Sequence, residues 1–142
     1  MPLTASSAER YRKPLYIWGP PVGMALAIFI GSAIPGRDIP QYPDIFNNFI
    51  HFVEFAALGF FLARALVNFR ISIRRFDTVI WTTVICAGYG LIVELYQFTV
   101  PNRVFDMADL AMDAAGALAG SVIYCLAFIR NKQNHDEDIT QR

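Results

Sequence analysis

The sequence predicts an all-α membrane protein in which four transmembrane helices form one bundle, with both termini in the cytoplasm. Three observations support this prediction. Of the 142 residues, 55% are hydrophobic and 17% are charged, which is more apolar than a typical soluble domain. Four apolar stretches each reach the roughly 20 residues that a helix needs to cross the bilayer core. Lys and Arg residues gather at alternate connections between these stretches.

We expect one membrane domain over residues 14–130, between a cytoplasmic N-terminal segment at 1–13 and a polar cytoplasmic tail at 131–142. Each apolar stretch should be a helix, because a backbone in lipid must satisfy its polar groups within its own segment. A soluble helical bundle is the alternative. It would need a polar stripe on every helix, and the segment PVGMALAIFIGSAI carries no charge. The predicted helices cover residues 14–34, 45–67, 78–98 and 104–129.

The first apolar stretch is interrupted by Pro20 and Pro21. Proline suits the first turn of a helix and disrupts its interior, so we expect the main helix to begin near Pro20. Tyr16 and Trp18 would then lie in the aromatic belt of the membrane interface. A cleaved signal sequence is an alternative, but the apolar core is longer than that of a usual signal. We therefore predict a retained membrane anchor.

The distribution of basic residues predicts the orientation. Ten of the 12 Lys and Arg residues lie before the first helix, around the connection between the second and third helices, or after the fourth helix. Because basic residues are retained on the cytoplasmic side, both termini and the middle connection should be cytoplasmic. The short loops at 35–44 and 99–103 should face outward.

Three of the predicted helices each carry polar residues on one face. An ionisable group in lipid costs a few kcal/mol, so such groups usually face a bundle interior or a water-filled cavity. At a helical rise of about 1.5 Å per residue, the polar residues of these three helices all lie in the outer half of the membrane. We therefore expect one acidic crevice that opens to the outside. The residues are Asn47, His51 and Glu54 in the second helix, Glu94 and Gln97 in the third, and Asp106, Asp109 and Asp113 in the fourth.

The acids of this crevice outnumber its nearby bases, which are His51 and Arg103. Several carboxylates cannot all stay ionised in a low-dielectric pocket without compensation. The cluster should therefore hold protons, bind a cation or receive a cationic ligand group. His51, Glu94 and Asp109 are the candidate catalytic residues, through acid–base chemistry or through a divalent ion. A network that only fixes helix packing is the alternative, and the identity of any metal or cofactor stays open.

The remaining polar residues are candidates for ligand binding. Arg103 has the planar guanidinium that recognises phosphate or carboxylate groups, although an arginine at the interface can also simply extend toward lipid headgroups. The predicted ligand-binding residues are Asn47, Glu54, Gln97, Arg103, Asp106 and Asp113.

Two classes of function receive no support from the composition. The formal net charge of zero gives no indication of a nucleic-acid partner. Cys86 and Cys125 both lie in apolar stretches, and no CxxC or Cys/His spacing suggests a zinc knuckle or a redox pair.

Two blocks of the sequence resemble the VanZ-like family of small bacterial integral membrane proteins. The first block, NNFIHFVEFAALGF (47–60), is similar to the start of the family's second helix, with Asn47-Asn48 in place of a charged pair. The second block, GLIVELYQFTVPNRVFDMADLAMDAAGALAG (90–120), follows a family pattern of Glu, Gln, Pro-x-Arg, two Asp and a Gly-Ala-x-x-Gly end, with Asp113 where Asn is usual. The matching residues of the second block are Glu94, Gln97, Pro101, Arg103, Asp106, Asp109, Gly116 and Gly120.

The resemblance implies a multi-pass protein of the bacterial inner (cytoplasmic) membrane that acts in the cell envelope. The family is named for a protein linked to low-level resistance to the glycopeptide teicoplanin. We expect the bilayer and a lipid or lipid-linked envelope component as partners, the latter bound in the outward crevice. A membrane-embedded hydrolase or transferase acting on such a lipid is one alternative, and a structural accessory subunit is another.

Overall fold

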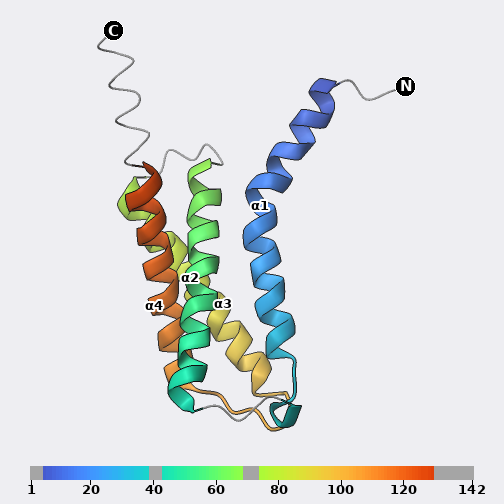
Figure 1. Cartoon of the computed structure of the whole chain (residues 1–142), viewed down its shortest axis with the longest axis vertical. Helices are drawn as coiled ribbons and strands as arrows, with labels where there is room; N and C mark the ends of the chain where they lie inside the picture. Colours follow the sequence, from blue (N-terminus) through green and yellow to red (C-terminus); the bar gives the residue numbers. More distant parts are fainter. Residues whose placement is uncertain (1–4, 39–42, 69–73, 130–142) are drawn as a thin grey trace.

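The computed structural model describes residues 5–38, 43–68 and 74–129, and all secondary-structure elements in this part of the chain are helices (Figure 1). Four helices are long and apolar enough to cross a membrane, which confirms the predicted fold class. The expected tail at 131–142 lies outside the described residues. The elements are α1 (Ala5–Ser32), η1 (Gly36–Asp38), α2 (Asp44–Asn68), α3 (Arg75–Gln97) and α4 (Met107–Tyr124), which continues as a π-helical turn, η2 (Cys125–Ile129).

The first helix starts earlier than the sequence suggested. It begins at Ala5 and contains Pro14, Pro20 and Pro21, so the expected start near Pro20 is wrong. A proline inside a helix removes one backbone hydrogen bond and presses on the preceding turn, and a helix can accommodate this by bending. Figure 1 shows such a bend between the first turns of α1 and the rest of the helix.

The fourth helix begins at Met107 instead of residue 104, because Asp106 is its N-terminal cap. Asp106 has an extended backbone, and its carboxylate accepts a hydrogen bond of 2.7 Å from the Ala108 N–H. This bond satisfies one of the free N–H groups at the start of a helix. Residues 98–106 consequently form a connection whose last residue lies beside the site described below.

Helices α2 and α4 pack with their backbones nearly in contact. A Cβ atom at Gly116 would collide with the carbonyl of Phe52, and one at Gly120 would collide with the carbonyl of Ala56. Small residues at this spacing allow such an approach between membrane helices. The Gly116–Gly120 stripe therefore fixes which residues of α2 and α4 face each other.

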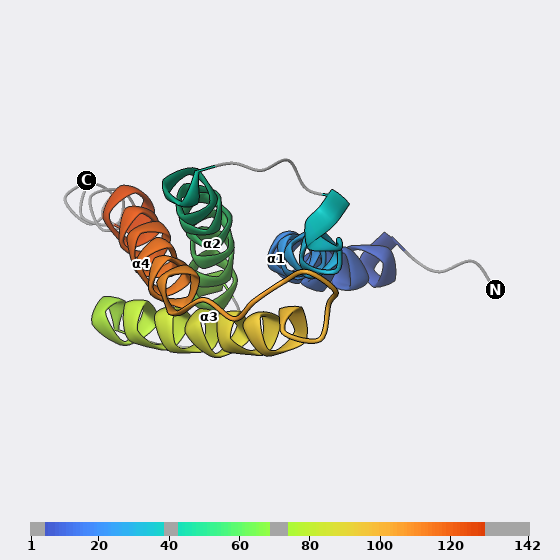
Figure 2. The same ribbon diagram turned by 90° about the horizontal axis from the view of Figure 1, so that it is seen from below.

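Helix α1 stands to one side of the other three helices (Figure 2). Of its apolar span, 17% of the residues are buried, compared with 33% to 39% for the other spans. Ile28 nevertheless reaches the core beside Phe55 and Leu58, and the Tyr89 hydroxyl of α3 donates to the Ala25 carbonyl at 2.6 Å.

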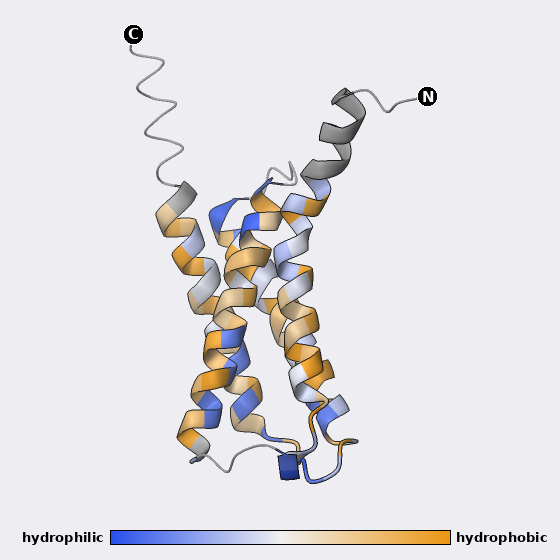
Figure 3. Ribbon diagram, turned by 45° about the vertical axis from the view of Figure 1, so that its right-hand side comes forward, coloured by the Kyte–Doolittle hydropathy of each residue, from blue (hydrophilic) through white to orange (hydrophobic). Residues whose placement is uncertain are grey.

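Different helix ends and connections lie at the two ends of the bundle. The start of α1 and the end of α4 lie at one end, and the connections around η1 and residues 98–106 lie at the other (Figure 1). Figure 3 shows hydrophilic residues on the helices near the end with these connections. The Gly36 N–H donates to the Pro101 carbonyl at 3.1 Å, and Asn102 adopts a left-handed backbone with φ of 59°. The orientation of this end relative to the cell stays a prediction.

Candidate functional site: a buried histidine–carboxylate cluster beside a cavity

His51 of α2 lies between two aspartates of α4. Its Nδ1 is 3.0 Å from Oδ1 of Asp113, and its Nε2 is 3.6 Å from Oδ2 of Asp109. The exposed fractions of His51, Asp109 and Asp113 are 8%, 5% and 0%. The two aspartates are one helical turn apart, so they contact opposite nitrogens of the same ring.

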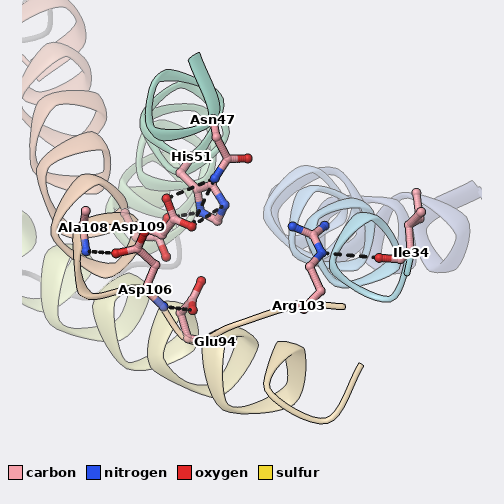
Figure 4. A network of polar contacts seen from close by, with 9 residues as sticks. Ile34, Asn47, His51, Glu94, Arg103, Asp106, Ala108 and Asp109 are labelled. Carbon is pink, nitrogen blue, oxygen red and sulfur yellow. Dashed lines mark hydrogen bonds and ion pairs between the residues drawn. The ribbon is translucent and has the colours of Figure 1, made fainter. Parts of the chain in front are cut away.

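Asn47 holds the carboxylate of Asp109 from one turn before His51. Its side-chain amide donates to the two carboxylate oxygens at 3.2 and 3.3 Å (Figure 4). Asn47 and His51 on α2 therefore face Asp109 and Asp113 on α4 as two matched pairs. The close packing at the Gly116–Gly120 stripe gives the two helices this register.

Glu94 of α3 completes the cluster and is fully buried. Its Oε2 accepts a hydrogen bond of 3.1 Å from the Asp106 N–H, whereas its buried Oε1 has no hydrogen-bond partner among the described residues. One ligating atom from each of His51, Glu94 and Asp109 lies within 4.8 Å of the other two. The three predicted catalytic residues thus come together from three helices.

The cluster holds more carboxylate oxygens than its neighbours satisfy. In the described part of the chain, no Lys or Arg forms an ion pair with Glu94 or Asp113, and the buried Oδ2 of Asp113 also lacks a hydrogen bond. Gly90 of α3 makes room for this oxygen, because a Cβ atom there would lie 2.6 Å from it. Buried polar atoms are normally hydrogen-bonded, so these two oxygens point to a missing partner.

A cavity of about 310 Å³ adjoins the cluster and shares His51 with it. Arg103 lies at its wall, and the Nε of this arginine donates to the Ile34 carbonyl at 3.4 Å. The other polar lining residues come from α1, α2, α3 and η1, and apolar residues complete the wall. The lining residues are Ile28, Gly31, Ser32, Ile34, Asp38, Asn47, Ile50, His51, Glu54, Val93, Gln97 and Arg103.

The predicted ligand-binding residues fall into three groups. Glu54, Gln97 and Arg103 line the cavity, and Asn47 lines it while also holding Asp109. Asp113 is buried against His51. The exposed Asp106 caps α4 and does not appear in the cavity wall.

The expected crevice is divided in the structure. Glu54 faces the cavity, whereas Glu94, Asp109 and Asp113 are buried beside it and do not line it. The buried carboxylates are therefore separated from the open space, and His51 belongs to both.

The part of the wall that α1 and η1 supply was not predicted from the sequence. Ile28 and Ser32 are one turn apart and face the cavity, and Asp38 lies beyond them. The four-residue spacing of Ile28 and Ser32 is compatible with one helical face. An almost entirely apolar helix gives no contrast between faces, however, so this signal was too weak to orient α1.

The arrangement can support two kinds of chemistry. His51 has one nitrogen engaged by Asp113 and the other directed toward Asp109, which is a suitable geometry for proton transfer. The second is the binding of an anionic group, because Arg103 has a planar, permanently charged guanidinium beside the cavity.

These features define the class of protein: a multi-pass helical membrane protein with a buried His–carboxylate cluster beside a polar cavity. The chain belongs to the VanZ/LLP1 family, whose model matches residues 8–129. This match includes the four spans long and apolar enough to cross a membrane and confirms the resemblance seen in the two sequence blocks. No curated protein and no solved structure matches the chain.

Proposed function

We propose that this VanZ-like protein binds the headgroup of an anionic lipid or lipid-linked component of the bacterial envelope in the cavity beside His51. The observation that carries the proposal is the composition of the cavity wall. The wall combines the polar side chains of Arg103, Asn47 and Gln97 with aliphatic residues such as Ile28 and Val93. This combination suits a ligand with a charged head and an apolar chain.

Each part of the wall has a role in the proposal. Arg103 binds a phosphate or carboxylate group through its planar fork. Asn47, Gln97 and Glu54 bind hydroxyl or amino groups of the headgroup. The apolar chain leaves between α1 and the rest of the bundle, and the shallow burial of α1 supports this route.

The proposed location is the bacterial inner membrane, with the cavity end on the outer side. The distribution of Lys and Arg supports this orientation. Lipid-linked envelope components would then reach the cavity from the outer leaflet. A contribution to glycopeptide resistance is part of the proposal on the strength of family membership alone.

The test is native mass spectrometry of the purified protein, with Arg103→Gln compared against Arg37→Gln. Arg37 is a suitable control because it lies in the neighbouring connection, its side chain is 74% exposed and it does not line the cavity. Loss of a hydrogen bond to a charged group costs about 1.5–3 kcal/mol, so Arg103→Gln should reduce the amount of co-purified anionic lipid by roughly tenfold or more. Equal lipid retention by the two variants would contradict the proposal.

A second candidate function is a membrane-embedded hydrolase or transferase acting on the same class of lipid. The observation that favours it is the convergence of His51, Glu94 and Asp109 next to the cavity. Under this hypothesis, Glu94→Gln and Asp109→Asn abolish turnover of the co-purified lipid but leave its binding intact. Unchanged turnover in both variants would exclude it.

A purely structural role is less well supported by the same site. A network that only fixes helix packing is expected to satisfy its buried oxygens. Glu94 and Asp113 each leave one buried oxygen without a hydrogen bond.

A further inference from the structure

We propose that His51, Glu94 and Asp109 bind one divalent transition-metal ion, such as Zn²⁺ or Mn²⁺, where α2, α3 and α4 meet. The three residues come from three helices and are buried together. This inference goes beyond lipid binding in the cavity and holds whichever lipid occupies it.

Each of the three side chains is oriented by a second contact. Asp113 contacts the Nδ1 of His51 at 3.0 Å, which leaves Nε2 for a ligand. The Asp106 N–H donates to Oε2 of Glu94, which leaves the buried Oε1 without a partner in the described chain. Asn47 donates to Asp109 (Figure 4). Metal-binding histidines commonly have such a carboxylate on their other nitrogen, and that partner raises the affinity for the ion.

The distances are close to those that an ion requires. A tetrahedral ion with bonds of about 2.1 Å separates its ligand atoms by roughly 3.4 Å. The Nε2 of His51 and the Oδ2 of Asp109 are already 3.6 Å apart. All three ligating atoms lie within 4.8 Å of one another, so a small adjustment of the side chains would bring them to the spacing that an ion requires.

The charges of the cluster also favour a cation. Glu94 is buried away from water, with an exposed fraction of 0%. No Lys or Arg in the described part of the chain forms an ion pair with it. Taking an unpaired carboxylate out of water is costly. A divalent ion would compensate Glu94 and Asp109 together and would give the unpartnered Oε1 a ligand.

The donor set selects the kind of ion. Imidazole suits Zn²⁺ and other transition metals, whereas Mg²⁺ and Ca²⁺ prefer oxygen ligands alone. Three protein ligands also leave a coordination position for water or substrate, as in catalytic zinc sites. Because His51 also lines the cavity, its imidazole would contact both the ion and a bound headgroup.

The test uses the full chain without a polyhistidine tag and with His135→Gln, because the sequence contains two histidines. After treatment with a chelator, the protein is titrated with Zn²⁺ and Mn²⁺ alone and binding is measured by calorimetry. We expect one equivalent to bind, and Glu94→Gln and Asp109→Asn each to weaken binding by at least roughly tenfold.

Asp77→Asn is the matched control, since Asp77 is an acid in the first turn of α3, at the opposite end of that helix from Glu94, and lies outside the ligand set and the cavity wall. Its affinity for the ion should stay within about twofold of the parent, because it removes no ligand or orienting partner. Failure of the parent protein to bind either ion, or equal binding by Glu94→Gln, would overturn the proposal. Lipid retention is measured on the same samples, so the metal site and lipid binding can fail independently.

Pulsed EPR on the parent protein covers the case in which the ligand variants do not fold. His51 is then the one histidine in the sequence, so coupling of bound Mn²⁺ to an imidazole nitrogen assigns it as a ligand. Bound Mn²⁺ without this coupling contradicts the proposed site.

Discussion

At the scale of single residues, His51 is the centre of the site because both of its ring nitrogens face carboxylates. Asp113 contacts one nitrogen and Asp109 lies near the other. His51 also lines the cavity. A change at any of its neighbours should therefore affect the chemistry of the cluster more than the stability of the bundle.

Asp113→Asn is the substitution that separates these two effects. The amide keeps a hydrogen-bonding group on Nδ1 of His51 but removes a buried carboxylate that has an unpartnered oxygen. Because like charges crowded in a buried site repel one another, removal of one carboxylate relieves repulsion from Glu94 and Asp109, and we expect the melting temperature of the metal-free protein to stay the same or rise. Affinity for Zn²⁺ should fall by about 10–100-fold.

The measurements are a thermal melt in detergent and a metal titration. A fall of several degrees in the melting temperature with unchanged Zn²⁺ affinity would show that Asp113 is a packing residue.

At the scale of elements, the α2–α4 contact determines the register of the site. We predict that Gly120→Ala is destabilising, because its Cβ atom would collide with the Ala56 carbonyl. Overpacking of this kind typically costs 1–3 kcal/mol, so we expect a loss of about 2 kcal/mol in the free energy of unfolding. Unfolding in detergent by chemical denaturant measures it.

Gly88→Ala is the matched control for this prediction. Gly88 also lies inside a membrane helix, but a Cβ atom there meets nothing within 4 Å. Its replacement should leave stability unchanged or raise it by up to about 1 kcal/mol through helix propensity. Equal effects of the two substitutions would mean that α2 and α4 are not in backbone contact.

Part of the site could be predicted from the sequence of the individual helices. Polar residues of α2, α3 and α4 could be assigned to one cluster because lipid excludes them and each set shares a helical face. His51, Glu94 and Asp109 accordingly meet. The start of α1 was misplaced because the helix contains Pro20 and Pro21 in its interior and does not begin at them. Its contribution to the cavity was missed because Ile28 and Ser32 lie on a helix with little contrast between its faces.

Other features depend on contacts between residues far apart in the chain. The bond between Gly36 and Pro101 joins the two connections at the cavity end, and no local pattern encodes it. The role of Asp106 as a cap, in contrast, depends on a local contact with Ala108, two residues further along the chain. Its position suggested a place in the crevice, whereas its carboxylate bonds to the adjacent helix start.

At the scale of the whole molecule, the distribution of charge predicts a cytoplasmic location for both termini. This prediction can be tested with single cysteines at the two ends of the bundle. Thr99 is exposed in the connection at the cavity end, and Asn68 is exposed at the opposite end of α2. The native Cys86 and Cys125 are buried and are replaced by alanine in all variants.

We expect Thr99→Cys to react with a membrane-impermeant maleimide in intact spheroplasts, and Asn68→Cys to react only after permeabilisation. Labelling is read as a mass shift of the purified protein. The reverse pattern would place the cavity end in the cytoplasm and would remove access from the outer leaflet.

The most direct test of the central claim is an experimental structure of the protein soaked with Zn²⁺, with anomalous scattering recorded at the zinc edge. We predict one peak within about 2.2 Å of the imidazole of His51 and of carboxylate oxygens of Glu94 and Asp109. Density that shows these three side chains turned toward separate neighbours, with no peak between them, would contradict it.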